Sequence, residues 1–125
     1  MKICFYGSET DHQHFLALIK SIPKYADWMG SCQCCTDYDS FVDALRCTRY
    51  DAVFVTENNA NGMEGVIAVR NLCPGLPVIW FSNDEGFGCQ AYRLNTDFFH
   101  SKPLTPQILE IALDRLPSKR KCSIS

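Results

Sequence analysis

Apolar and polar residues follow two alternating patterns along this chain. Short, nearly continuous apolar runs predict strands at residues 2–6, 31–36, 51–55, 76–81 and 97–100. Between these runs, apolar residues recur every three or four positions, which is the spacing of an amphipathic helix packed on a core. Each strand–helix cycle takes about 20 to 25 residues, which is typical of βαβ units around a parallel sheet.

Capping residues and prolines indicate where the first and last helices begin and end. Thr10 or Asp11 is expected to cap the first helix, because a side-chain oxygen there can accept a hydrogen bond from a free N–H of the first turn. Pro23 is expected to stop this helix. Thr105 followed by Pro106 predicts the start of the last helix, since proline suits the first helical position.

Five strand–helix units predict an α/β fold. We expect a doubly wound, five-stranded parallel sheet flanked by five helices, with strand order 2-1-3-4-5. In such sheets, ligands bind beyond the carboxyl ends of the strands, where the strand order reverses. The turns that would meet there are residues 7–11, 56–61, 82–85 and 101–103. Candidate functional residues therefore belong to these four turns.

The length and charge of the chain limit its organisation and its partners. Its 125 residues, of which 46% are hydrophobic, suit one domain at residues 2–116 followed by a basic tail at 117–125. The net charge of −2 argues against direct nucleic-acid binding. No run approaches the about 20 apolar residues that span a bilayer, and the N-terminus has no signal-peptide pattern. We expect a cytoplasmic protein without membrane association.

Eight cysteines raise the question of a metal site. In an extended segment, Cys32 and Cys34 share one face while Cys35 points to the other. A zinc site usually adds a second Cys or His pair at similar spacing, and this sequence offers only scattered histidines. In a cytoplasmic protein the cysteines are expected to stay reduced, partly as small buried apolar residues. We therefore expect no metal.

Three segments stand out at the ends of the last three predicted strands: "FVTENNANGMEG" at 54–65, "LPVIWFSND" at 76–84 and "FFHSKPLT" at 98–105. Together they resemble the receiver domain of two-component response regulators, the CheY-like family, over residues 2–116. The resemblance implies a flavodoxin-like fold in which an aspartate after the third strand accepts a phosphoryl group, beside Mg²⁺ held by an acidic pair after the first strand. It places Glu57 at the phospho-acceptor, and it places the switch hydroxyl, the switch aromatic and the Lys-Pro pair at Ser82, Phe99, Lys102 and Pro103.

The chain departs from that family at the positions that handle metal and phosphate. Glu57 is one methylene longer than aspartate, and Gly7 and Ser8 stand in place of the acidic pair. Glu9 lies one position beyond, and a lone carboxylate is a poor substitute for two hard oxygen ligands of a divalent cation. The resemblance therefore implies a degenerate receiver, or pseudo-receiver, that is not an enzyme and takes neither Mg²⁺ nor another cofactor.

Glu57 has two interpretations within that family. Its charge near Lys102 and Ser82 could hold the domain in the activated shape, as phosphorylation would. Alternatively, it is an inert remnant that forms an ion pair with Lys102, worth about 0 to 1 kcal/mol in a partly exposed pocket. Both interpretations expect the side chains of Glu57 and Lys102 to face each other.

Two other functions stay open from the sequence. Glu57 and Glu9 together suggest a receiver that can still be phosphorylated. The turn "YGSET" at residues 6–10 also resembles the phosphate loop of flavodoxins, electron carriers that bind flavin mononucleotide at the start of the first helix. Asp11 follows this turn, and its charge would oppose the phosphate.

The resemblance implies that this domain works through protein–protein contacts in signalling or transcriptional regulation. The expected partner is a sensor kinase, an effector, an output domain or a second copy of the chain. The expected surface is the face of the fourth helix, fifth strand and fifth helix, which here includes Tyr92, Phe99 and residues 107–115.

Overall fold

The computed structural model describes residues 2–116, without side-chain detail at 28–31, and the predicted basic tail lies outside these residues. Its strands form one parallel sheet in the order β2-β1-β3-β4-β5. They are β1 (Ile3–Tyr6), β2 (Cys32–Cys35), β3 (Ala52–Val55), β4 (Val78–Ser82) and β5 (Phe98–Ser101). The predicted fold class and strand order are confirmed.

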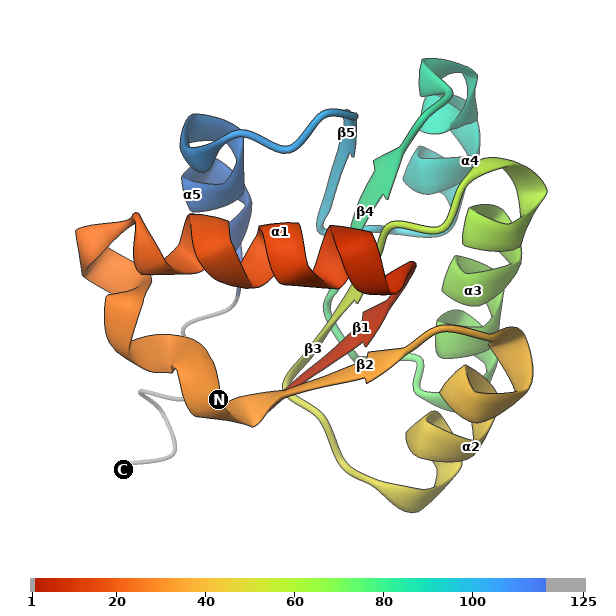
Figure 1. The fold of residues 1–125 in the computed structure, drawn as a ribbon. Coiled ribbons are helices and arrows are strands. Elements are labelled where there is room, and N and C mark those ends of the chain that lie inside the picture. Colours follow the sequence, from red (N-terminus) through yellow and green to blue (C-terminus); the bar gives the residue numbers. More distant parts are fainter. Residues whose placement is uncertain (1, 117–125) are drawn as a thin grey trace.

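Helices cover both faces of this sheet, with α1 and α5 on one face and the other three α-helices on the opposite face (Figure 1). Their bounds are α1 (Glu9–Lys20), α2 (Tyr38–Cys47), α3 (Asn59–Leu72), α4 (Gly88–Arg93) and α5 (Pro106–Asp114), with 3₁₀ segments η1 (Pro23–Ser31) and η2 (Glu85–Phe87). In the part of the chain that the structure describes, none of these helices has the length and apolar character needed to cross a membrane.

The first helix begins earlier than the sequence predicted. Ser8 is its N-cap, because the Ser8 hydroxyl accepts a hydrogen bond from the Asp11 N–H at 3.0 Å. Thr10 and Asp11 are therefore residues of the first turn, and the prediction that one of them is the cap was wrong. Serine caps a helix as well as aspartate and better than threonine. Pro23 starts η1 after the helix has already ended at Lys20.

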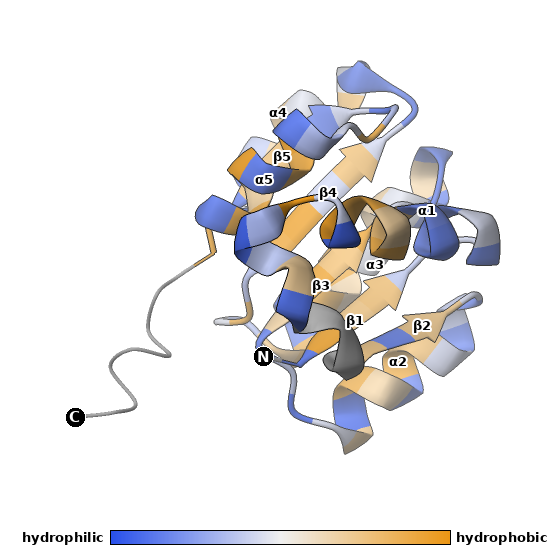
Figure 2. Ribbon diagram, turned by 60° about the vertical axis from the view of Figure 1, so that its left-hand side comes forward, coloured by the Kyte–Doolittle hydropathy of each residue, from blue (hydrophilic) through white to orange (hydrophobic). Residues whose placement is uncertain are grey.

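The sheet separates two apolar cores, because successive strand residues point to opposite faces. Phe54 belongs to the core under α1 and α5, together with Phe15. Trp80 belongs to the core on the other face, together with Phe41 and Val66. Figure 2 shows the strands in hydrophobic colours and hydrophilic segments on the surrounding helices and turns. Because the strands themselves are mostly apolar, the polar residues near the sheet lie in the turns that follow the strands.

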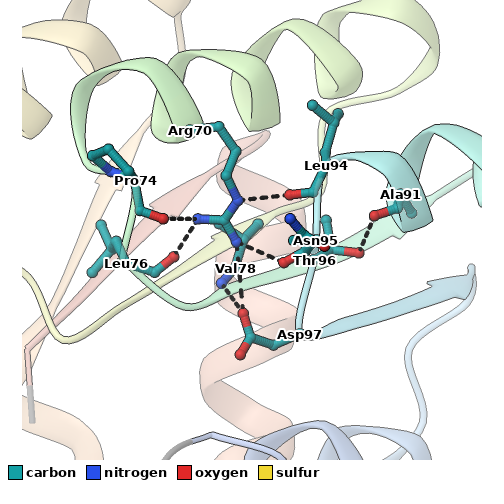
Figure 3. Close-up of polar contacts among 9 residues, drawn as sticks. All are labelled: Arg70, Pro74, Leu76, Val78, Ala91, Leu94, Asn95, Thr96 and Asp97. Carbon is teal, nitrogen blue, oxygen red and sulfur yellow. Dashed lines mark hydrogen bonds and ion pairs between the residues drawn. The ribbon is translucent and has the colours of Figure 1, made fainter.

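The side chain of Arg70 joins α3 to the segment between α4 and β5 (Figure 3). Its guanidinium donates hydrogen bonds of 2.7 to 3.2 Å to four main-chain carbonyls, those of Pro74, Leu76, Leu94 and Asn95. Asp97 completes the contact, with its Oδ1 3.7 Å from Nη2 of Arg70. The same oxygen accepts the Val78 N–H at 3.0 Å. One side chain thus holds the end of α4 to the start of β4.

Candidate functional site at the carboxyl edge of the sheet

The four turns predicted to meet do meet at the carboxyl edge of the sheet (Figure 1). The Thr56 N–H donates to the Tyr6 carbonyl at 2.8 Å, which ties the turn after β3 to the end of β1. The Lys102 N–H donates to the Ser82 carbonyl at 2.8 Å and ties the turn after β5 to the end of β4. The candidate side chains therefore lie around one shallow edge.

Lys102 is the central charged group of this edge. Its ammonium lies 2.9 Å from Asp11 Oδ2 and 2.8 Å from Asn58 Oδ1. The side chain of Lys102 is only 19% exposed and that of Asp11 only 31%, so the pair is partly shielded from water. These contacts join α1, the turn after β3 and the turn after β5.

The expected pairing of Lys102 with Glu57 is therefore wrong. The early start of α1 places Asp11 in its first turn, where the carboxylate reaches the lysine. Glu57 is half-buried, and among the described residues it makes no ion pair with Lys102. The pKa of Tyr6 rises to about 12, mainly because the phenol is buried and next because Glu57 carries a negative charge near it. The Glu57 carboxylate therefore lies near enough to the Tyr6 phenol, at the end of β1, to influence it.

Gly7 and Thr56 explain why the first acidic position is empty of a side chain. Thr56 is 1% exposed, and a Cβ added at residue 7 would lie 2.0 Å from its Oγ1. The Thr56 hydroxyl has no hydrogen-bond partner among the described residues. A carboxylate at residue 7 is excluded while the Thr56 side chain keeps this position.

The other two candidate acidic-pocket positions, Ser8 and Glu9, lie at the start of α1. Ser8 is engaged as the cap of α1, and Glu9 is an exposed residue of the first turn. Over residues 2–116, no group of three or more His, Cys, Asp or Glu side chains is placed to hold a metal ion. Lys102, which is itself a cation, is bound by the side-chain oxygens of Asp11 and Asn58.

Three cysteines of β2 lie where the alternation of the strand predicted. Cys32 and Cys34 pack on one core and Cys35 belongs to the other, as the alternation along β2 predicted. The seven cysteines within the described residues are all free. Cys4 and Cys35, on neighbouring strands, have their sulfur atoms 4.0 Å apart. Burial raises the pKa of the Cys32 thiol to about 12.

Comparisons with known proteins rest on structure, because no protein-family model and no curated protein matches the sequence. A CheY-like receiver domain protein from Methanospirillum hungatei superposes with a TM-score of 0.74 at 14% identity, covering 96% of each chain. The chemotaxis protein CheY4 from Vibrio cholerae gives 0.74 at 17% identity, covering 93% of this chain and 98% of its own. This chain has the receiver-domain fold.

A third solved structure is the receiver domain of the sensor histidine kinase PA1611 from Pseudomonas aeruginosa, which coordinates magnesium in its active-site cleft. It superposes with a TM-score of 0.70 at 15% identity and covers 92% of this chain and 95% of its own. At identities this low, the superpositions show a shared fold only. The chemistry at the carboxyl edge of this sheet must therefore be inferred from the residues of this chain.

Within the receiver fold, the remaining candidates have well-defined contacts. Ser82 is fully buried, and its hydroxyl accepts the Asp84 N–H at 3.0 Å. Phe99 lies edge-on against Trp80, with ring centroids 5.0 Å apart, so its ring is turned into the core. Pro103 is exposed and follows a cis peptide bond from Lys102.

Sequence reasoning missed the amides of this edge. Asn58 binds the Lys102 ammonium, and the Asn59 N–H donates to Asn83 Oδ1 at 3.0 Å. Asn83 Nδ2 donates in return to Asn59 Oδ1 at 3.3 Å. Asn59 has a positive φ of 56°, a conformation that asparagine tolerates better than most residues. The amide-rich sequences after β3 and β4 were a signal for these contacts.

Proposed function

We propose that this chain is a receiver-type signalling domain that has given up phosphoryl transfer, a pseudo-receiver that works through protein contacts in the cytoplasm. The observation that carries this proposal is the partly shielded contact of the Lys102 ammonium with Asp11 and Asn58. That contact gives the lysine a permanent internal partner.

The chemistry of phosphoryl transfer supports this proposal. Attack on a phosphoryl donor passes through a transition state rich in negative charge, so a divalent cation and a lysine must both be available to neutralise it. Gly7 offers no ligand, Ser8 is a helix cap, and Glu9 is exposed in the first turn of α1. These three residues therefore support the proposal that no divalent cation is held at the end of β1. For the same reason, we propose that the chain is not an enzyme.

The expected output surface also has contacts that would keep it in one state. Phe99 is turned inward against Trp80, with the two ring centroids 5.0 Å apart. On the surface, Tyr92 of α4 is 86% exposed and Ile111 of α5 is 50% exposed. Exposed aromatic and aliphatic side chains of this kind suit a protein partner. A sensor kinase, an effector or an output domain would bind here in the absence of phosphate.

The first experiment measures phosphoryl transfer by intact mass. Incubation with acetyl phosphate and Mg²⁺ is expected to leave the mass of the chain unchanged. Glu57→Asp restores the usual acceptor and is expected to stay unmodified as well, because the metal ligands are still missing. A phosphorylatable receiver treated in parallel shows that the donor is active. An acid-labile gain of one phosphoryl group on the wild-type chain would overturn the proposal.

The second experiment tests the output surface. The chain is paired in a two-hybrid assay with the sensor kinases and output domains of the organism that encodes it. Tyr92→Ser and Lys102→Ala are expected to weaken the interaction that scores positive in this assay. Tyr92→Ser removes a side chain of the proposed surface, and Lys102→Ala removes the contacts that hold the turn next to β5. Lys20→Ser is the matched control and should have no effect, because Lys20 is exposed at the end of α1, on the other face of the sheet from α4. A pair that tolerates both test variants would contradict the proposed surface.

A further inference from the structure

The face formed by α2 and α3 carries apolar side chains that its own chain does not cover. Among the residues whose side chains the structure describes (2–27 and 32–116), five large hydrophobic side chains are exposed, and three of them lie on these two helices. They are Tyr38 at 42%, Ile67 at 37% and Leu72 at 37% exposure. This face lies across the sheet from α1 and α5 (Figure 1), apart from the carboxyl-edge site.

A groove of about 270 Å³ runs between the two helices at this face. It is lined by Tyr38, Val42, Arg46, Ala68, Asn71 and Leu72. Ile67 lies one helical turn before Asn71 and extends the apolar surface along α3. The surface of the groove is therefore about half apolar and half polar, with the Arg46 guanidinium as its one charged lining group.

The charges on α2 specify what can cover this groove. Asp39, Val42 and Arg46 are spaced i, i+3 and i+7, so they form one stripe along the helix with an acid at one end, an apolar centre and a base at the other. Asp39 and Arg46 are exposed, and neither takes part in an ion pair among the described residues. When two such helices lie antiparallel, the acidic end of one stripe lies opposite the basic end of the other.

We propose that a second copy of this chain packs on the α2–α3 face, with the two α2 helices antiparallel around a twofold axis. Such an interface uses the same patch on both subunits. Asp39 of each copy then meets Arg46 of the other at both ends, and the twofold axis passes between Val42 and the exposed Asp43. Tyr38 and Leu72 lose their exposure along the groove.

The limited size of this apolar surface sets the expected strength of the dimer. Stable interfaces bury about 1,200 to 2,000 Å² in total, and weak, transient ones bury less. The dimer is therefore expected to be weak, with association visible only at concentrations of about 10 µM or more. Because an ion pair lies at each end of the proposed interface, added salt should screen these charges and weaken the dimer.

Charge reversal tests the pairing directly by sedimentation equilibrium of the full chain. Asp39→Arg alone or Arg46→Asp alone places like charges opposite each other and is expected to weaken self-association at least about tenfold. An equimolar mixture of the two variants restores both ion pairs in a heterodimer, and so does the double variant with itself. Both samples should again approach twice the 14.2 kDa of one chain.

The controls separate this face from the proposed output surface. Tyr92→Ser lies on α4 and should leave the association unchanged. Loss of the dimer in Tyr92→Ser but not in Arg46→Asp would assign it to the other face and overturn the inference. A wild-type chain that stays monomeric up to about 200 µM, well above the expected association range, would overturn it as well. Phosphoryl transfer plays no part in these measurements, so the two proposals fail independently.

Discussion

At the residue scale, the contact between Gly7 and Thr56 ties the loss of the acidic pair to packing. Gly7→Ala is expected to lower the free energy of unfolding by about 1 to 3 kcal/mol, because its Cβ would overlap the buried Thr56 hydroxyl. Thr56→Ala removes an unpaired hydroxyl and should cost little on its own. The double variant should therefore be more stable than Gly7→Ala. Urea unfolding of the four proteins measures this coupling, and strictly additive effects would contradict it.

His12 supplies a pH-dependent contribution to stability. It is 8% exposed, its ring centroid lies 5.1 Å from that of Phe5, and its Nε2 has no hydrogen-bond partner among the described residues. Burial lowers the pKa of this imidazole, and the charge of Glu9 opposes the shift only partly. The folded state thus favours the neutral ring, while the unfolded chain takes up a proton as the pH falls through the ordinary histidine range.

Stability should therefore fall as the pH drops below about 6.5 and level off below the folded-state pKa. Urea unfolding between pH 7.5 and 5 measures this loss, and His12→Leu should reduce it. His14→Gln is the control, because His14 is exposed on the same helix. An unchanged pH profile in His12→Leu would show that other groups cause the loss.

The sequence predicted the positions of the site residues better than their partners. Lys102 lies at the expected edge, just after β5, and Phe99 lies within β5, because the strand positions are fixed by the sheet. Asp11 could not be assigned to Lys102, because the pair is 91 residues apart in the chain and depends on where α1 begins. Ser8, Thr10 and Asp11 can all cap a helix, so the sequence alone left the start of α1 uncertain by two or three residues.

At the element scale, the strands were the most predictable part of the fold. β3 and β4 are buried at every residue, so their continuous apolar runs distinguish them from amphipathic helices. Helix ends were harder to predict, because several polar residues near each end can satisfy the same free N–H groups. Arg70 gave no local signal either, since its acceptors are main-chain carbonyls that any residue could supply.

The short helix α4 is expected to depend on Arg70. Only Ala91 of α4 is buried, so apolar packing contributes little to holding it in place. Arg70→Met removes the hydrogen bonds to Leu94 and Asn95, and amide exchange across residues 94–97 should become at least about tenfold faster. Arg70→Lys should rescue only part of this protection, because an ammonium lacks the planar fork of a guanidinium.

Hydrogen exchange read by mass spectrometry or NMR measures the effect. Arg93→Met is the matched control, because Arg93 is an exposed arginine on α4 itself and makes no such carbonyl contacts. Exchange in β1 and β3 should stay unchanged in every variant. Equal acceleration throughout the chain would show that Arg70 supports the global fold rather than this segment.

At the scale of the whole molecule, one ammonium group connects three distant parts of the chain. Lys102 follows β5, Asp11 belongs to α1 and Asn58 precedes α3, with sequence separations of 91 and 44 residues. In a metal-binding site of this architecture, a divalent cation would make such connections. Here the Lys102 ammonium makes these connections between the three segments.

The stability of the molecule should therefore be independent of Mg²⁺. A ligand that binds only the folded state raises the unfolding midpoint in proportion to the logarithm of its concentration. We expect the same thermal midpoint in 10 mM Mg²⁺ as in EDTA at matched ionic strength. This Mg²⁺ concentration is about tenfold above the dissociation constant of a weak, millimolar site. Lys102→Met should lower the thermal midpoint in both buffers. The expected loss in the free energy of unfolding is about 1 kcal/mol or less, because the ion pair is partly exposed. A wild-type midpoint that rises with Mg²⁺ would reveal a cation site at this edge and would return phosphoryl transfer to consideration.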